Sequence, residues 1–186
     1  MRTEIRFAGF GGQGIIRSGL ILSMAACIYS DKNAVQTQSY GPESRGGSCK
    51  SEVVIADEEI DFPKIDDPDI VVIMSQEAYH KYVNTVKKDA IILVDPDKVT
   101  HRDDPSDTKI YDIPATKIAE EMGKTIIANV VMIGAVTVIT NIVTPEAMKK
   151  AVLRNVPKGT EKLNMAAFEK GYNYGEQLLK NQSKSQ

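Results

Sequence analysis

Four closely spaced glycines near the start of the chain form a pattern that can bind phosphate groups. Gly9, Gly11 and Gly14 fit G-x-G-x-x-G, and Gly12 lies inside it. Glycine allows the close backbone approach and the left-handed conformations that such a turn needs. A helix that begins there presents unpaired N–H groups and a partial positive charge, which suit a pyrophosphate. The segment therefore predicts a phosphate-binding turn, and the alternative is a tight turn without a ligand.

The nature of the phosphate ligand is a separate question. A nicotinamide dinucleotide site has an acidic residue at the end of the second strand, about 20 residues after the turn. Residues 34–40 contain no Asp or Glu, and Asp31 precedes the expected second strand. The sequence therefore disfavours NAD and leaves coenzyme A, another cofactor with a diphosphate, as a candidate.

A second glycine-rich loop, residues 40–47, follows the expected second strand and contains an arginine. Arg45 is followed by Gly46 and Gly47, and its guanidinium could bind a phosphate or carboxylate with two parallel hydrogen bonds. Glu43 could hold Arg45 or reach a partner. The alternative is a surface turn with a solvated Arg–Glu pair.

The remaining reactive side chains form no catalytic group in the sequence. The two cysteines, Cys27 and Cys49, are too few to ligate an iron–sulfur cluster, and we expect reduced thiols in a cytoplasmic protein. The two histidines, His80 and His101, are expected to be solvated or partly packed. Residues 95–97, Asp-Pro-Asp, follow a predicted buried strand and are a weak site candidate. We predict no catalytic residue and no metal ligand in this chain.

Strands and helices alternate along the chain and are expected to position these loops at one edge of a sheet. The expected strands cover residues 5–10, 34–37, 52–56, 69–74, 90–94 and 110–113, and a segment around Ile60 that forms a hairpin with 52–56 across Asp57-Glu58. The expected helices cover residues 15–28, 78–86 and 114–123, the part of 125–143 that follows a short strand, and segments opened by Thr144-Pro145-Glu146 and by Thr160.

This order of elements predicts an α/β fold, a Rossmann-like three-layer fold with a mostly parallel sheet and helices on both faces. Residues 1–180 are expected to form a single domain and residues 181–186 a frayed polar tail. The uncharged stretch 125–143 is interrupted by Asn129 and other polar residues, so it is expected to be a core element and not a membrane span. With 23 Lys and Arg against 25 Asp and Glu, the net charge of −2 gives no electrostatic case for nucleic acid or an anionic membrane.

The two glycine-rich loops together resemble a known family. Residues 9–15 read GFGGQGI and residues 40–47 read YGPESRGG, and at this spacing they resemble the gamma subunit of the 2-oxoacid:acceptor (ferredoxin) oxidoreductases. The expected helices that contain Asn129 and Asn164 are also similar to this family, so the resemblance covers essentially the whole chain. The loop form G-P-E-x-R-G-G is most similar to the 2-oxoglutarate branch.

The resemblance implies a subunit of an enzyme that oxidatively decarboxylates a 2-oxoacid to its acyl-CoA, here succinyl-CoA. It implies alpha, beta and delta partner subunits that carry thiamine diphosphate, Mg and iron–sulfur clusters, with ferredoxin or flavodoxin as the electron acceptor. The present chain would be the gamma-type catalytic domain, would bind coenzyme A and help assembly, and would be inactive alone.

On the same resemblance, Gly11, Gly12 and Gly14 would contact the CoA diphosphate, with Tyr40 and Arg45 closing over it. The complete set of residues expected to bind the cofactor is Gly9, Phe10, Gly11, Gly12, Gln13, Gly14, Ser39, Tyr40, Gly41, Arg45 and Gly46.

Three alternatives stay open from the sequence. The subunit could belong to an enzyme acting on pyruvate or on branched-chain 2-oxoacids. It could be a purely structural scaffold whose glycine turn is empty. A free NAD(P)-dependent reductase is the third alternative, which the missing acid at the end of the second strand opposes.

Overall fold

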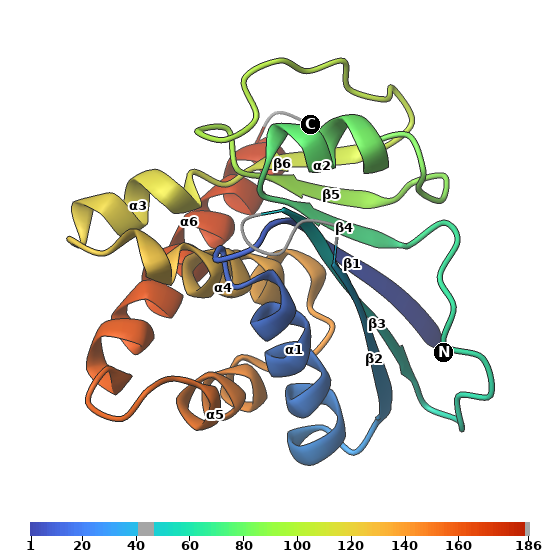
Figure 1. Ribbon diagram of the computed structural model, residues 1–186, viewed down its shortest axis with the longest axis horizontal. Helices are drawn as coiled ribbons and strands as arrows, with labels where there is room; N and C mark the ends of the chain where they lie inside the picture. The colour runs from blue at the N-terminus through green and yellow to red at the C-terminus, as the bar shows by residue number, and fades with distance from the viewer. Residues whose placement is uncertain (41–46, 185–186) are drawn as a thin grey trace.

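Strands and helices alternate in the computed structural model, which describes residues 1–40 and 47–184 (Figure 1). Strands form one six-stranded sheet in the order β2-β3-β1-β4-β5-β6. Their bounds are β1 (Arg2–Phe10), β2 (Asn33–Tyr40), β3 (Ser48–Ala56), β4 (Ile70–Ile73), β5 (Ile91–Val94) and β6 (Lys109–Asp112). Strands β1, β4, β5 and β6 are parallel, whereas β3 is antiparallel to both of its neighbours, β1 and β2. The predicted α/β class is confirmed, with a mixed sheet because β3 inserts between β1 and β2.

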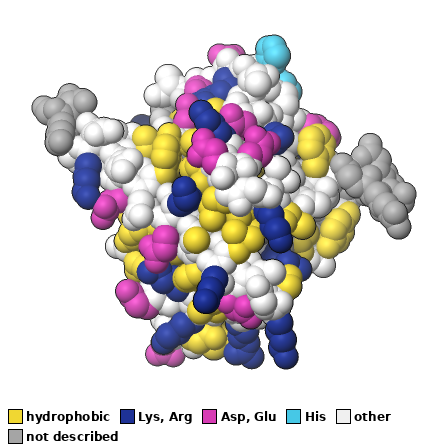
Figure 2. All heavy atoms as spheres, turned by 90° about the vertical axis from the view of Figure 1, so that its left-hand side faces the viewer, with side chains coloured by type: hydrophobic (Ala, Val, Ile, Leu, Met, Phe, Trp, Pro, Cys, Tyr) yellow, Lys and Arg dark blue, Asp and Glu magenta, His cyan; other side chains and the backbone are white. Residues whose placement is uncertain are grey.

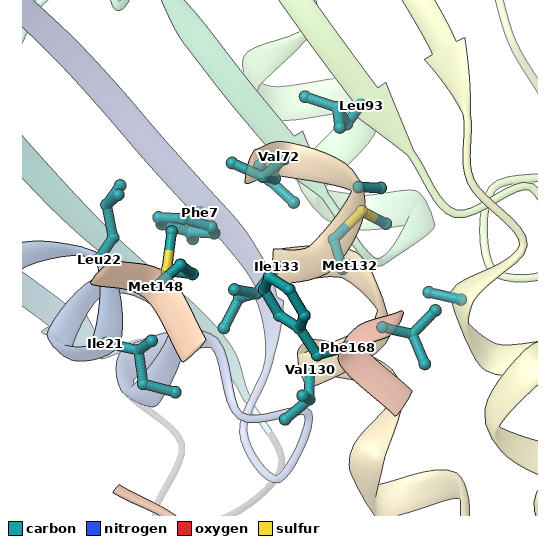
Figure 3. Close-up of a cluster of buried hydrophobic side chains, with 14 of the residues drawn as sticks. Phe7, Ile21, Leu22, Val72, Leu93, Val130, Met132, Ile133, Met148 and Phe168 are labelled. Atoms are coloured by element: carbon teal, nitrogen blue, oxygen red, sulfur yellow. The ribbon is translucent and has the colours of Figure 1, made fainter. Parts of the chain in front are cut away.

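Helices cover both faces of the sheet, as predicted. Their bounds are α1 (Ile15–Tyr29), α2 (Gln76–Tyr82), α3 (Ala115–Glu121), the 3-10 helix η1 (Thr125–Ile127), α4 (Ala128–Thr140), α5 (Pro145–Asn155) and α6 (Glu161–Lys184). The larger core unites one sheet face with α1, α4, α5 and α6. Figure 3 shows part of it, with Phe7, Leu22, Val72, Leu93, Met132, Ile133, Met148 and Phe168. A smaller core lies between the other face and α2.

The short parallel strands explain why both faces are covered. In β4, Val72 belongs to the larger core, while Val71 and Ile73 belong to the smaller one. Alternate residues of a strand point to opposite faces, so a continuous apolar run can be stable only where helices cover both. The predicted strands at 69–74 and 90–94 are therefore confirmed.

Two predicted strands are wrong. Residues 57–69 form no strand, and the carbonyls of Ile65 and Asp66 instead accept hydrogen bonds from Arg6 Nη2 at 3.2 and 3.1 Å. Arg6 is buried and also donates to Glu52 Oε1 at 2.7 Å; this buried guanidinium needs acceptors, which the irregular segment supplies. The short strand predicted at the start of 125–143 is the 3-10 helix η1, because the chain turns at Gly123 (φ +82°) and continues almost directly into α4.

Three helix boundaries differ from the predictions. Helix α2 ends at Tyr82, although the apolar spacing continues to residue 86. Pro114 is the residue that precedes α3 and not its first helical residue. Helix α6 extends to Lys184, so residues 181–184 continue the helix beyond the expected domain end.

Helix α4 is buried along nearly its whole length, as expected for a core element. No helix in the described part of the chain combines the length and apolar character needed to cross a membrane. Strands β1 and β4 are parallel neighbours, so their carboxyl ends and the start of α1 lie together at one edge of the sheet.

Candidate functional site

The glycine turn links β1 to α1 as predicted. Gln13 N donates to Phe10 O at 3.2 Å, and Gly11 N donates to Gly47 O at 2.9 Å. Gly12 (φ +96°) and Gly14 (φ +75°) have left-handed backbones, which L residues with a Cβ adopt at a cost. The turn therefore needs glycine at these two positions for conformational reasons.

Several N–H groups at the start of α1 are open to a ligand. Gly14 O accepts hydrogen bonds from Ser18 N at 2.9 Å and Ser18 Oγ at 3.0 Å, which closes the first helical turn. Among residues 1–40 and 47–184, no acceptor is found for the N–H groups of Gly12, Gly14, Ile15 and Ile16. The N–H of Gly11 is already paired with Gly47. Open donors at a helix N-terminus can bind an anion.

The side chain of Gln13 holds the turn in place. Its Oε1 accepts from Phe10 N and its Nε2 donates to Met74 O, each at 2.7 Å. A Cβ at Gly9 would lie 2.4 Å from Gln13 Oε1, so Gly9 is needed for this side chain to fit. These two residues of the expected binding set hold the turn against the end of β4.

A pocket of about 620 Å³ opens beside the turn. Its walls come from the turn, α1, the β2–β3 pair, η1 and α4: Phe10, Gly11, Gly12, Gly14, Ile15, Ile16, Arg17, Leu20, Gln36, Gln38, Tyr40, Cys49, Ile126 and Asn129. We call it the glycine-turn pocket. The structure thus brings together Phe10, Gly11, Gly12, Gly14 and Tyr40 of the expected set.

Of the other residues expected to bind the cofactor, Ser39 lies away from the pocket and three are not described. Ser39 is exposed but does not line the glycine-turn pocket, whereas its neighbours Gln38 and Tyr40 do; successive strand residues point to opposite faces. Gly41, Arg45 and Gly46 lie outside the described residues. Cys49 lines the pocket as a free thiol, and burial raises its pKa, which disfavours the reactive thiolate.

Residues remote in sequence complete the pocket and were not predicted as site residues. Asn129, at the start of α4, donates from Nδ2 to Gly14 O at 3.4 Å. A Cβ at Gly14 would lie 2.5 Å from that Nδ2, so α4 packs directly on the turn. The sequence signal was a polar residue inside an uncharged stretch, which indicates a buried helix but not its neighbour.

The surroundings of the turn favour an anionic ligand. Arg17 lines the glycine-turn pocket, and Lys98 lines a second hollow of about 430 Å³ on the other side of Gly12. No Asp or Glu is among the residues that line these two hollows. Ile126 lines both, and its side chain is 72% exposed. Figure 2 views the side of the molecule that carries α3, where hydrophobic side chains gather in the middle with both basic and acidic side chains around them.

The Asp95 candidate has a structural role. Its Oδ2 accepts from Thr116 N at 2.9 Å and Thr116 Oγ1 at 2.6 Å, and its Oδ1 accepts from Asp97 N at 3.1 Å. Burial raises the pKa of this carboxyl, while the bonds from Thr116 oppose that rise. Asp95 therefore anchors the start of α3 and has no lone pair directed to an open site.

The two histidines lie on the surface near Gln76. Gln76 Oε1 accepts from Thr100 N and His101 N, both at 3.0 Å, and Gln76 Nε2 lies 3.1 Å from His80 Nε2. Both histidines are exposed, which confirms that they are solvated. Within the described ranges, no group of three or more His, Cys, Asp or Glu side chains could hold a metal ion.

Comparisons with known proteins agree in sequence and in fold. A family model described as pyruvate ferredoxin/flavodoxin oxidoreductase matches residues 4–174. The 2-oxoglutarate synthase subunit KorC of Methanocaldococcus jannaschii is 57% identical over 180 residues, which cover 96% of this chain and 96% of that protein.

Two solved structures have the same fold. The gamma subunit of a keto/oxoacid ferredoxin oxidoreductase from Geobacter sulfurreducens superposes with a TM-score of 0.84 at 41% identity, covering 93% of this chain and 95% of that one. The 2-oxoglutarate:ferredoxin oxidoreductase of Magnetococcus marinus, solved with 2-oxoglutarate, coenzyme A and succinyl-CoA bound, gives a TM-score of 0.83 at 24% identity. It covers 94% of this chain and 31% of that chain, and at this identity it establishes the fold alone.

Proposed function

The chain belongs to the pyruvate ferredoxin/flavodoxin oxidoreductase family, and from this premise we propose that it is the gamma subunit of a 2-oxoglutarate-oxidising complex, in which it binds coenzyme A. The substrate assignment is supported by the 57% identity to a 2-oxoglutarate synthase subunit over nearly the whole length of both chains. The alternatives with pyruvate or a branched-chain 2-oxoacid would keep the same site on this chain.

One observation carries the coenzyme A assignment: open backbone donors at the start of α1 face a large pocket without acidic residues. The N–H groups of Gly12, Gly14, Ile15 and Ile16 have no acceptor in the described residues, and Arg17 lies at the same pocket. A diphosphate placed there accepts from these N–H groups and benefits from the helix dipole. Tyr40 lines the opposite wall, and we extend the site to Arg45, Gly41 and Gly46 of the neighbouring loop.

This chain's contribution to the reaction is positioning. Bound coenzyme A supplies the thiol that accepts the acyl group. The turn holds the cofactor through its diphosphate, and the apolar side chains of Leu20 and Ile126 line part of the pocket. Holding a reactant beside its partner converts a bimolecular step into a nearly unimolecular one, with an effect of up to about 7–11 kcal/mol in ideal cases.

The oxidation itself takes place on partner subunits in this proposal. Alpha, beta and delta subunits hold thiamine diphosphate with Mg and the iron–sulfur clusters, and ferredoxin or flavodoxin accepts the electrons. The described residues offer no cluster of metal-ligating side chains for this chemistry. We place the complex in the cytoplasm, in keeping with the two unpaired cysteines, Cys27 and Cys49.

Two glycine variants test the coenzyme A site. Gly12 (φ +96°) and Gly159 (φ +85°) both have left-handed backbones and open space where a Cβ would stand, but only Gly12 lines the glycine-turn pocket. We expect Gly12→Ala and Gly159→Ala to lose similar stability, about 1–2 kcal/mol. Titration calorimetry of coenzyme A into the complex assembled with its partner subunits should show at least about tenfold weaker binding for Gly12→Ala alone.

The control separates binding from folding. Gly159→Ala should lose much less affinity for coenzyme A than Gly12→Ala, because Gly159 does not line the glycine-turn pocket and a Cβ there meets nothing within 4 Å. If Gly12→Ala binds coenzyme A as tightly as the wild type, the turn is empty in the working enzyme and the chain is a scaffold.

A further inference from the structure

A smaller pocket of about 110 Å³ lies directly behind Asn129. It shares Arg17, Ile126 and Asn129 with the glycine-turn pocket, so the two spaces are neighbours. Its remaining walls come from η1, α4, the α5–α6 connection and α6: Lys124, Ile127, Val130, Val156, Pro157, Thr160, Leu163 and Asn164. We call it the amide pocket. Most of these walls are apolar, which suits the faces of a flat ring.

Two buried amide side chains give this pocket a specific chemistry. Asn129 and Asn164 are only 4% and 6% exposed. Asn164 Nδ2 donates to Thr160 O at 3.0 Å, and Asn129 Nδ2 donates to Gly14 O at 3.4 Å. A backbone carbonyl can only accept, so these contacts fix which end of each amide is the NH₂ group. Each side chain is left with its Oδ1 as an acceptor.

Neither of these two oxygens has a donor within residues 1–40 and 47–184. In the same part of the chain, only Ser30 Oγ is a side-chain polar atom that has neither solvent exposure nor a hydrogen-bond partner. The two asparagine oxygens are not in that state. The oxygens of Asn129 and Asn164 are therefore accessible, and both residues line the amide pocket. Accessible acceptors on the wall of a mostly apolar pocket are specific partners for a ligand that carries N–H donors.

We propose that the amide pocket receives the adenine ring of coenzyme A, whose exocyclic amino group donates to the oxygens of Asn129 and Asn164. This inference rests on the proposed function: Asn129 lines both pockets, so an adenosine end that leaves the diphosphate on this side enters the amide pocket. The apolar side chains of Val130 and Leu163 cover the ring. Arg17 and Lys124 at the same pocket face the ribose 3′-phosphate of the cofactor. A base with a carbonyl oxygen in place of the amino group meets two acceptors there and is disfavoured.

A comparison of two ligands on the unmodified protein tests the adenine assignment. In the complex assembled with its partner subunits, competition calorimetry compares coenzyme A with its hypoxanthine analogue, in which a carbonyl replaces the amino group. We expect coenzyme A to bind about tenfold more tightly than the analogue. Equal affinities would overturn the adenine assignment.

Two variants on helix α6 test whether Asn164 causes the preference for coenzyme A over its hypoxanthine analogue. Asn164→Ala should bind coenzyme A more weakly and bring the ratio of the two affinities close to one. Asn173→Ala, an exposed position on the same helix α6, should keep the wild-type ratio. A wild-type ratio in Asn164→Ala would place the base elsewhere.

The outcomes separate this inference from the proposed function. If coenzyme A binds in a Gly12-dependent way without discrimination between the bases, the adenine assignment fails and the coenzyme A site stands. If the assembled complex binds no coenzyme A, both fail. Asn164 also donates to Thr160, so if Asn164→Ala fails to fold, the comparison of the two ligands on the wild-type protein decides.

Discussion

The side chain of Gln13 helps to fix the geometry of the glycine turn. It bonds to the backbone of Phe10 on one side and of Met74 on the other, so the turn is tied to the end of β4. Donors held in place before a ligand arrives need no reorganisation on binding. The neighbouring N–H groups of Gly12 and Gly14 are thereby preorganised for an anion.

A buried tyrosine gives a prediction at the same scale. Tyr79 donates to Asp104 Oδ1 at 2.7 Å and accepts from Asp103 N at 2.9 Å. Burial, with the bond to Asp104, raises the pKa of Tyr79 from 10.0 to about 12. Folding thus favours the neutral phenol, whose contribution to stability is complete below pH 10 and is lost as the pH rises towards 12.

We expect Tyr79→Phe to lose about 1–3 kcal/mol of stability near neutral pH, because the partners of the hydroxyl lose their hydrogen bonds. The variant should also lose less stability than the wild type between pH 10 and 12. Urea unfolding across this range measures both effects. Tyr40→Phe, at an exposed tyrosine, is the control and should leave the wild-type profile unchanged; parallel alkaline profiles for Tyr79→Phe and the wild type would contradict the assignment.

Helices α4 and α6 form the element pair that supports the site. Asn129 is on α4 and Asn164 on α6, so the spacing of the two helices sets the width of the amide pocket. A Cβ at Gly171 of α6 would lie 1.8 Å from Val131 O of α4. The helices therefore touch backbone to backbone at this point, which no residue larger than glycine permits.

The helix contact predicts that Gly171→Ala destabilises the protein by about 3 kcal/mol, because the added methyl group pushes the helices apart. Asn173→Ala, two residues further along α6 and exposed, is expected to change stability by less than about 0.5 kcal/mol. Chemical denaturation compares the two variants. A loss in Gly171→Ala no larger than that of Asn173→Ala would show that the helices can separate at little cost.

At the scale of the whole molecule, the proposed role of the chain is to bind a cofactor, and its described residues contain no group of three or more His, Cys, Asp or Glu side chains that could hold a metal ion. The glycine-turn pocket, the amide pocket and the hollow beside Lys98 are all lined by Ile126 of η1, which is 72% exposed. Ile126 therefore offers an apolar contact to any ligand bound in one of these three pockets. This arrangement fits a subunit that presents a cofactor to a partner.

If this chain binds coenzyme A and its partner subunits carry out the oxidation, the purified chain alone should not oxidise 2-oxoglutarate. Reduction of ferredoxin, followed with 2-oxoglutarate and coenzyme A present, should stay at background for the single chain. Adding the alpha, beta and delta subunits should restore it, because they supply the thiamine and cluster chemistry. Activity of the single chain would refute the proposed division.

The sequence by itself determined the parts of the site that depend on local conformation. The glycines of the turn, the apolar runs of β4 and β5, and the proline and threonine that open α5 act on their immediate neighbours, so their structure could be predicted without the rest of the chain. The role expected for the second loop remains a prediction where it concerns Gly41, Arg45 and Gly46.

Only the tertiary structure decided which of these segments lie in contact with one another. The insertion of β3 between β1 and β2, the position of Ser39 away from the pocket, and the inward bonds of Gln13 depend on strand pairing and packing. Asn129 and Asn164 reach one pocket because α4 and α6 approach closely, although each lies more than a hundred residues from the glycine turn in the sequence. Contacts over such separations follow from the burial of a shared core, which no local pattern encodes.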